Sequence, residues 1–298
     1  MLRIKNLNKS YTNRKVLENL TLNIASGEVY GLLGANGAGK TTTINIICNL
    51  LNADSGYITI NNQPISESTK KIIGIAPQEN LLYKTLSCAE NLQFFADIYG
   101  LDRETKNKQI EATLKAVNLL DRAKSPVETL SGGMQRRLNI AVALVHQPQL
   151  VILDEPTTGL DIEARYEIWE LIRQLKNQGM TILLTTHLLD EAERLCNRIG
   201  ILKNGTILAE GSLSELKTLI PGQEVLVLQT IQEDEAIALA QKYGFIPRRY
   251  GNDLAFLLPE PLELKEIMTR FEGIPMDSIS RQPVRLEHIY LEITQVNR

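Results

Sequence analysis

A glycine-rich stretch, GANGAGKT at Gly34–Thr41, has the residue types and spacing that hold a nucleotide phosphate. An apolar run, Val29–Leu33, precedes it, and a stretch of helical character, Thr42–Leu51, follows it. In such a strand, turn and helix, all three glycines of the stretch permit positive φ angles, so that backbone N–H groups surround an anion. Lys40 would bring a positive charge to the β- and γ-phosphates, and the Thr41 hydroxyl would ligate Mg²⁺. The predicted phosphate-binding residues are Gly34, Ala35, Asn36, Gly37, Ala38, Gly39, Lys40, Thr41 and Thr42.

A pair of acids, Asp154 and Glu155, ends an apolar run at Leu150–Leu153. A carboxylate at the end of a buried strand beside a phosphate-binding loop is where Mg²⁺ is held, so Asp154 is the expected ligand. Glu155 is one residue further along the strand and would point to the opposite face, where it can orient or deprotonate an attacking water. Two solvated loop acids are the weaker alternative, because a buried strand rarely ends in two carboxylates without a counter-charge.

Three single residues at the ends of predicted strands are further candidates. Gln78 follows Ile72–Ala76 and offers an oxygen to a cation and an amide to a water, although a lone glutamine there is usually a loop residue. His187 follows Thr181–Thr185, where a parallel sheet would place it near a γ-phosphate, although a lone histidine is usually structural. Tyr11 lies in a turn and can stack on a purine, but an ordinary turn aromatic is an equally good interpretation.

A second glycine turn, LSGGMQ, leads into a helix predicted from Met134 to His146. Ser131, Gly132 and Gly133 lie where bare backbone N–H groups and the positive end of the helix can bind an anion. Taken alone, the turn is explained better by a plain serine N-cap.

The composition is that of a globular protein with a sizeable core. The chain has 298 residues, of which 43% are hydrophobic and 22% charged, which suits one large domain or two smaller ones. A net charge of −3 gives no basic field for nucleic acid. The sequence has no apolar run near the ~18 residues of a membrane span, and its start has no secretory signal. Cys48, Cys88 and Cys196 lack metal-site or disulfide spacing, so a reducing compartment is expected.

Alternation and capping patterns predict the elements that position the candidates. Apolar and polar residues alternate at Leu2–Lys9 and Leu20–Ile24, which indicates half-buried strands. An Asn-Gly pair within Ile199–Leu208 indicates a hairpin. Helices are predicted after three capping residues, Ser87, Asp102 and Asp161. The last of these helices is expected to bury an apolar face made of Ile162, Tyr166, Trp169, Ile172 and Leu175.

Taken together, these pieces resemble an ATP-binding cassette (ABC) ATPase over about Leu2–Leu216. The order and spacing of six motifs agree with that family: the Walker A loop GANGAGKT, Gln78 of the Q-loop, the signature LSGGMQ, the Walker B segment LVILDE, the D-loop TGLD and His187 of the H-loop. The family's usual signature, LSGGQ, has glutamine in the fifth place, where this chain has Met134 followed by Gln135.

The resemblance implies an α/β fold: a P-loop NTPase core with an antiparallel β subdomain and a helical insert at about 86–148. It divides the chain into a cassette, residues 1–216, and an accessory domain, residues 217–298. Between Val225 and Ser280 the predicted elements run β-α-β-β-α-β, which favours a small α+β, ferredoxin-like module, with a final helix at Leu286–Thr294. A cassette followed by such a tail resembles the branch that serves ABC-2 type exporters.

The function that the resemblance implies is the ATP-hydrolysing subunit of an exporter. The implied partners are a separate ABC-2 type membrane permease and a second copy of the chain in a head-to-tail dimer, without nucleic acid. The protein would then be cytoplasmic and held at the inner face of the cell membrane by the permease. The implied catalytic residues are Glu155, His187, Lys40 and Gln78; Mg²⁺ would be held by Thr41, Gln78 and Asp154; and ATP would be bound by the glycine stretch, Tyr11, and Ser131, Gly132 and Gly133 of the second copy.

The main alternative is a soluble ABC ATPase that acts on nucleic acid or ribosomes. Such relatives carry two fused cassettes, a long coiled-coil insert or strongly basic arms, whereas this chain has one P-loop, no heptad pattern and a net charge of −3. A small-molecule kinase is a third alternative, but it would leave LSGGMQ and Glu155 without a role.

Overall fold

The computed structural model describes residues 1–295, which form two compact units. The first unit is Met1–Glu210, and the second begins at Gly211. This division comes earlier than the boundary after Leu216 that we predicted. The cause is the short helix α8 (Leu213–Lys217), which starts at a Ser212 capping box and packs against α11 (Leu286–Gln295), a helix of the second unit.

A six-stranded sheet forms the centre of the first unit, in the order β10-β9-β3-β8-β7-β6. All pairs among β9, β3, β8, β7 and β6 are parallel, and β3, β7 and β8 are buried along their whole length. Because parallel strands end at the same edge, the segments that follow them meet there. The strands are β3 (Val29–Leu33), β6 (Ile73–Ala76), β7 (Leu150–Asp154), β8 (Thr181–Thr186), β9 (Arg198–Lys203) and β10 (Thr206–Gly211).

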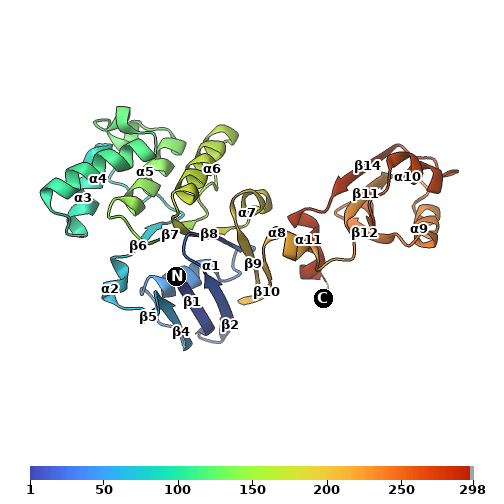
Figure 1. The fold of residues 1–298 in the computed structure, drawn as a ribbon, viewed down its shortest axis with the longest axis horizontal. Coiled ribbons are helices and arrows are strands. Elements are labelled where there is room, and N and C mark those ends of the chain that lie inside the picture. Colours follow the sequence, from blue (N-terminus) through green and yellow to red (C-terminus); the bar gives the residue numbers. More distant parts are fainter. Residues whose placement is uncertain (296–298) are drawn as a thin grey trace. The chain divides into compact units, whose positions relative to one another are not determined.

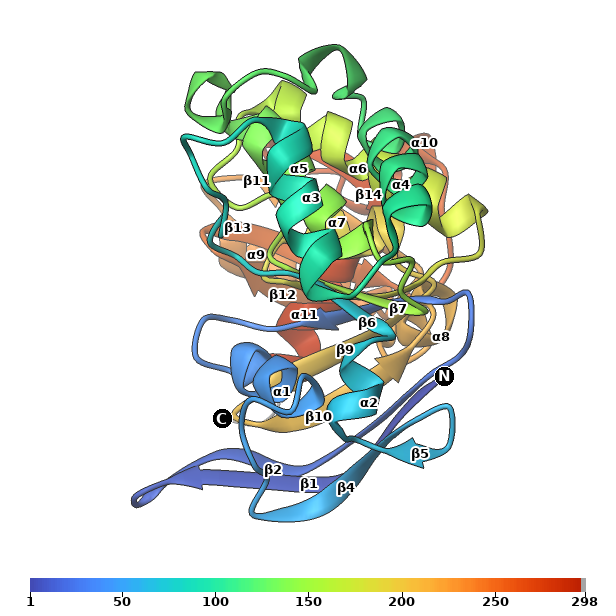
Figure 2. The same ribbon diagram turned by 90° about the vertical axis from the view of Figure 1, so that its left-hand side faces the viewer.

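Helices cover one face of this sheet, and a second sheet with one helix covers the other (Figure 1 and Figure 2). The helical layer holds the buried Trp169 and contains α3 (Cys88–Ile98), α4 (Arg103–Ala116), η1 (Leu120–Arg122), η2 (Val127–Thr129), α5 (Gly132–Leu144) and α6 (Ile162–Asn177). Against the opposite face pack α1 (Lys40–Ile47) and the antiparallel sheet β2-β1-β4-β5. The bounds of these strands are β1 (Leu2–Tyr11), β2 (Arg14–Ile24), β4 (Ser55–Ile60) and β5 (Gln63–Pro64), with short helices α2 (Glu67–Lys70) and α7 (Leu189–Leu195) elsewhere in the unit.

Capping residues set the start of the three helices for which the sequence predicted them. Ser87, Asp102 and Asp161 are the N-caps of α3, α4 and α6, as predicted, and each side chain accepts a hydrogen bond from a backbone N–H of its helix. In the predicted apolar face of α6, Trp169, Ile172 and Leu175 are buried, but the prediction is wrong at Ile162, which is 71% exposed, and at Tyr166, which is 50% exposed. The first turn buries Ala164 instead of Ile162, so the buried face differs from the predicted one at the start of the helix.

The second unit has the predicted β-α-β-β-α-β order. Its antiparallel sheet runs β12-β13-β11-β14, which is the strand arrangement of a ferredoxin-like module. One face packs on α9 and α10 through a core that includes Leu226, Phe256 and Phe271. The elements are β11 (Glu224–Gln229), α9 (Glu233–Lys242), β12 (Ile246–Tyr250), β13 (Asp253–Leu258), α10 (Leu264–Arg270), β14 (Ser278–Pro283) and the final helix α11.

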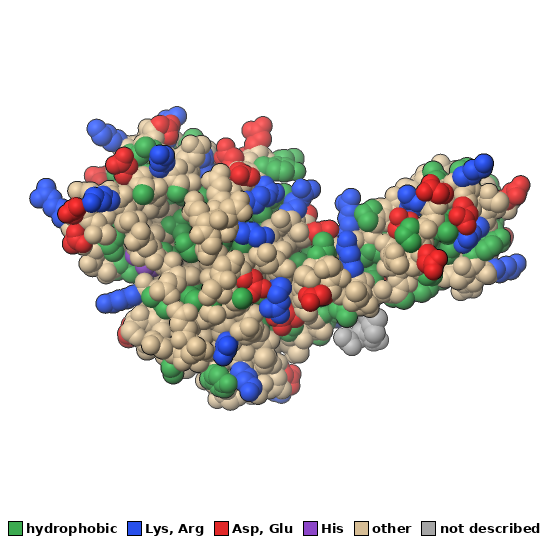
Figure 3. Space-filling view, viewed as in Figure 1, with side chains coloured by type: hydrophobic (Ala, Val, Ile, Leu, Met, Phe, Trp, Pro, Cys, Tyr) green, Lys and Arg blue, Asp and Glu red, His purple; other side chains and the backbone are tan. Residues whose placement is uncertain are grey.

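The surface carries charges of both signs. On the face drawn in Figure 3, lysine and arginine side chains are interspersed with aspartate and glutamate side chains. Within residues 1–295, no helix combines the length and the apolar character that crossing a membrane requires.

Gly74 of β6 sets how closely the helical layer approaches the sheet. A Cβ atom at this position would lie 1.9 Å from the carbonyl oxygen of Ala143 in α5. We predict that Gly74→Ala lowers the free energy of unfolding by about 1–3 kcal/mol, the usual cost of overpacking, as measured by chemical denaturation. Gly132→Ala is the control, because a Cβ there meets nothing within 4 Å. Equal stability of the two variants would show that β6 and α5 are not packed this closely.

Candidate active site

One cavity collects most of the residues that the sequence singled out. It has a volume of about 360 Å³ and lies at the carboxyl-end edge of the parallel sheet. The predicted residues that line it are Tyr11, Asn36, Gly37, Gly39, Lys40, Thr41, Thr42, Gln78 and Glu155, and two that were not predicted, Arg14 and Val16, complete the wall.

The glycines of the loop serve two different purposes. Gly37 has φ 80° and Gly39 has φ 116°, so both need the left-handed region that favours glycine. Gly34 does not adopt a positive φ, contrary to our prediction; it must be glycine because a Cβ would lie 2.6 Å from the carbonyl oxygen of Leu202. Three residues of the predicted phosphate-binding stretch do not line the cavity: Gly34, Ala35 and Ala38.

The Lys40 ammonium is buried in a ring of oxygen atoms. The side chain is 5% exposed, and Nζ donates to the carbonyl oxygens of Gly34 at 2.7 Å and Ala35 at 3.3 Å. Nζ also lies 3.1 Å from Oε1 of Glu155, with which it forms a buried ion pair. A cation held by carbonyl dipoles at the mouth of a glycine loop can serve a phosphate equally well.

Glu155 lies at the centre of the site. It follows the end of β7 with φ 47°, so a left-handed backbone aims its side chain, not the alternation of a strand as we had expected. Its Oε2 is 3.1 Å from both Thr158 Oγ1, which donates to it, and His187 Nδ1. Burial by itself would raise the pKa of this carboxyl, but the hydrogen bond and charge of Lys40, helped by His187, hold it below its ordinary value.

Asp154 has a different hydrogen-bond partner from those of Glu155. Its Oδ1 accepts a 2.5 Å hydrogen bond from Thr185 Oγ1 on the neighbouring strand β8. Burial raises the pKa of Asp154 above its ordinary value, although Thr185 and Lys40 oppose the shift. A buried carboxylate that costs free energy to ionise is suited to a cation.

The donors available for a divalent cation are hard oxygens. The described residues contain no group of three or more His, Cys, Asp or Glu side chains that could hold a metal by themselves. The predicted set instead combines one carboxylate, Asp154, with the hydroxyl of Thr41 and the amide of Gln78, and Thr41 and Gln78 line the cavity. Few protein ligands, all oxygen, fit Mg²⁺, which is commonly completed by water and substrate phosphates.

The signature turn lies elsewhere on the chain. Ser131 is the N-cap of α5, accepting a hydrogen bond from the Met134 N–H, and none of Ser131, Gly132 and Gly133 lines the cavity. The departure from the family pattern also has a visible consequence. Met134 packs against the core of the helical layer, while the Gln135 side-chain amide donates to the carbonyl oxygen of Leu130.

Several residues of the site were not predicted. Thr185 and Thr158 hold the two carboxylates, and Arg136 donates to the carbonyl oxygens of both Asp154 and Glu155. The sequence analysis assigned no role to Arg136. The only local signal for it is the pair of adjacent arginines, Arg136 and Arg137, that follows LSGGMQ.

Similarity to known proteins decides the family of this chain. The ABC transporter family model matches residues 17–158. The linearmycin resistance ATP-binding protein LnrL of Bacillus subtilis is 42% identical over 80% of this chain and 78% of its own length. This chain belongs to the ATP-binding subunits of ABC transporters. Members of this family hydrolyse ATP to power transport, and they pair with membrane permeases and dimerise.

Further relatives extend the match. The Nod factor export ATP-binding protein I of Cupriavidus metallidurans is 36% identical over 99% of this chain and 97% of its own length. Among solved structures, an ATP-binding subunit of an ABC transporter has a TM-score of 0.66 at 34% identity, covering 74% of this chain and 92% of its own. A dimeric ATP-binding cassette in a post-hydrolysis state, bound to ADP and Pi, has a TM-score of 0.64 at 29% identity, covering 71% of this chain and 98% of its own.

Removing the buried charge of Asp154 should stabilise the ABC subunit. Because the folded pKa lies above the unfolded value of about 3.9, ionised Asp154 costs folding free energy at neutral pH. We predict that Asp154→Asn raises the melting temperature at pH 7 by a few degrees in EDTA, and that the gain shrinks as the pH falls toward the unfolded pKa. Thermal unfolding across this pH range measures it.

Asp161→Asn is the matched control, because asparagine caps a helix as well as aspartate does. A melting temperature of Asp154→Asn below that of the wild type at pH 7 would contradict the prediction.

Proposed function

We propose that this chain is the ATP-binding and ATP-hydrolysing subunit of an exporter whose membrane part is a separate permease of ABC-2 type. The observation that carries the proposal is the cavity in which the glycine loop, Gln78 and Glu155 meet around the buried Lys40 ammonium. The export assignment is supported by the Nod factor export relative, whose match covers 99% of this chain and therefore includes the second unit.

The nucleotide would lie along the cavity with its phosphates on the glycine loop. Tyr11, at the end of β1 and 47% exposed, would stack on the adenine. Backbone N–H groups from Asn36 to Thr42, at the N-terminus of α1, would bind the phosphate oxygens. Mg²⁺ bound by Thr41, Gln78 and Asp154 would neutralise charge on the β- and γ-phosphates.

Lys40 and Glu155 would separate when the γ-phosphate arrives. The phosphate replaces Glu155 as the anionic partner of Lys40, so Oε1 of Glu155 becomes free to accept a proton from water. Its Oε2 stays fixed by Thr158 and His187, which keeps the base aimed. Losing the Lys40 charge also lets the pKa of Glu155 rise, which makes it a stronger base at the moment it is needed.

A second copy of the chain would complete the site. Ser131, Gly132 and Gly133 do not reach the cavity of their own chain, so they would bind the γ-phosphate of the other copy in a head-to-tail dimer. Charge-assisted hydrogen bonds contribute about 1.5–3 kcal/mol each. Two sites with two or three such bonds exceed the ~5.5 kcal/mol that moves an equilibrium from mostly open to mostly closed.

The permease would dock beside the segment that follows Gln78. Leu81 and Ile98 are 63% and 64% exposed, and the half-exposed ring of Tyr83 packs edge-on against Phe94 at 4.7 Å. The buried Asn91 side chain ties this segment to α3 by accepting from Tyr83 N–H and donating to the Tyr83 carbonyl. An ordered apolar surface of this kind suits a protein partner. Docking there would hold the subunit at the cytoplasmic face of the membrane.

Action on nucleic acid or ribosomes is less well supported. Binding to a polyanion relies on concentrated positive charge. The net charge is −3, and both signs are mixed over the face in Figure 3.

Glu155→Gln should separate binding from turnover. Glutamine keeps the shape of the side chain but cannot accept the proton of water, so we predict a loss of ATP hydrolysis of about 10²–10⁴-fold. ATP binding should persist, and the protein should accumulate as a dimer with Mg-ATP. Phosphate release and light scattering after size-exclusion chromatography measure the two effects.

Glu163→Gln is the control, because Glu163 is an exposed acid in the first turn of α6. It should hydrolyse ATP as the wild type does. Hydrolysis by Glu155→Gln at the wild-type rate would refute the role assigned to Glu155.

A further inference from the structure

The catalytic segments leave the sheet at a point where backbone pairing between β6 and β7 has ended. The last paired residues are Ala76 and Leu153. Gln78 follows the first strand, and Glu155 follows the second. Nothing in the strand ladder itself therefore fixes the distance between these two segments.

The Arg136 guanidinium bridges this gap. On one side, Nη1 donates to the carbonyl oxygens of Pro77 at 2.6 Å and Gln78 at 2.9 Å. On the other side, Nη2 and Nε donate to three successive carbonyl oxygens, those of Asp154 at 3.0 Å, Glu155 at 2.7 Å and Pro156 at 2.8 Å. One planar group with a fixed set of donors thus replaces the missing strand ladder.

The bridge is built from backbone dipoles and not from an ion pair. Arg136 is 3% exposed, and within residues 1–295 its guanidinium makes no salt bridge within 4.0 Å. Burial lowers its pKa from the ordinary value, while the charges of Asp154, Glu191 and Glu155 oppose that shift. Burying a guanidinium without a carboxylate partner costs free energy unless its N–H groups are hydrogen-bonded. The placement of Arg136 is therefore explained by the two segments that it holds together.

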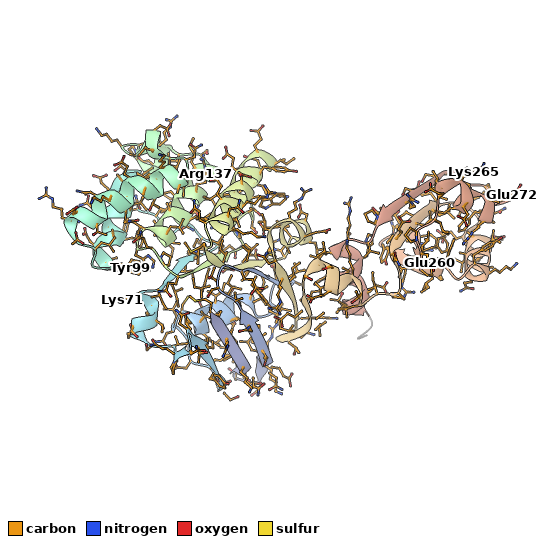
Figure 4. All side chains as sticks on the ribbon, in the orientation of Figure 1. Lys71, Tyr99, Arg137, Glu260, Lys265 and Glu272 are labelled. Carbon is orange, nitrogen blue, oxygen red and sulfur yellow. The ribbon has the colours of Figure 1, made fainter. Side chains whose placement is uncertain are left out.

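Arg136 also lies on the helix that begins with the signature turn. It is three residues after Gly133 in α5, so the helix tip that would bind the ATP of the second copy is rigidly joined to the guanidinium. The neighbouring Arg137, labelled in Figure 4, points elsewhere: its Nη1 donates to the carbonyl oxygens of Val117 and Asn118 at the end of α4.

We propose that Arg136 is a positioning residue that clamps the Gln78 segment to the Glu155 segment and couples both to the signature helix. A displacement of α5, imposed when its tip binds the nucleotide of the second copy, then moves the two catalytic segments of its own chain together. This inference rests on the proposed function, because the relative position of Gln78 and Glu155 matters only if both act in ATP hydrolysis.

Arg136→Lys tests the clamp in the full-length protein. Lysine keeps the charge but cannot span both segments, since its ammonium has three donors on a single atom. Because a misplacement of about 1 Å can cost 10²-fold in rate, we expect kcat for ATP to fall at least about tenfold. The KM for ATP and the binding of ADP should stay within about twofold, because Arg136 does not line the nucleotide cavity.

Arg137→Lys is the matched control. It makes the same change at a second buried arginine, which also binds carbonyl oxygens and pairs with Glu167, but away from the catalytic segments. Its kcat should stay within about threefold of the wild type. Thermal unfolding of both variants checks that they fold. Arg136→Met, which removes the charge as well as the donors, should lose at least as much kcat as Arg136→Lys.

The outcomes distinguish a failure of the Arg136 clamp from a failure of the proposed function. Equal losses of kcat in Arg136→Lys and Arg137→Lys, or a wild-type kcat in Arg136→Lys, would overturn the clamp while Glu155→Gln remains inactive. A rise in KM for ATP without a change in kcat would also overturn it, because Arg136 would then act on binding. If Glu155→Gln itself hydrolyses ATP normally, the proposed function fails, and the clamp fails with it.

Discussion

The buried ion pair between Lys40 and Glu155 is the interaction on which the rest of the site depends. Both side chains are nearly inaccessible to solvent, and the two charged atoms are 3.1 Å apart. A buried pair adds little net stability, yet losing one partner is costly because the other charge is left alone. Lys40 can therefore leave Glu155 only when another anion takes its place, and a nucleotide phosphate is an anion that the glycine loop is shaped to deliver.

The surrounding fold holds the other groups of the site in place while Lys40 exchanges Glu155 for a phosphate. The parallel sheet brings the ends of β3, β6, β7 and β8, which the site segments follow, to one edge. The Thr158 and His187 contacts retain Glu155 after the exchange, and Thr185 keeps Asp154 in a separate position. The Arg136 guanidinium then fixes the spacing between the two chain segments that carry Gln78 and Glu155. Binding energy at the loop is thus connected to the catalytic geometry through a few short, buried or partly buried contacts.

Much of the fold could be predicted from the sequence, because the signals for its helices and strands are local. The capping residues Ser87 and Asp102 and the β-α-β-β-α-β order of the second unit follow from neighbouring residues, and the structure agrees with them. Features set by distant contacts were missed. The requirement for Gly34 comes from Leu202, the direction of Glu155 comes from a left-handed backbone, and Ile162 is exposed because Ala164 occupies the tight contact with Gly133. The role of Arg136 needs five carbonyl groups from two separate segments, which no local pattern reveals.

The most direct test of this account is the pKa of Glu155, followed by ¹³C NMR of the labelled carboxyl group and assigned with Glu155→Gln. In the free protein the pKa should lie below the ordinary value for glutamate, because Lys40 and His187 favour the charged form. Adding ATP in EDTA, which permits binding without hydrolysis, should raise it, since Lys40 turns to the phosphate and negative charge arrives nearby. A pKa that stays unchanged or falls when ATP binds would contradict the exchange of partners on which the mechanism depends.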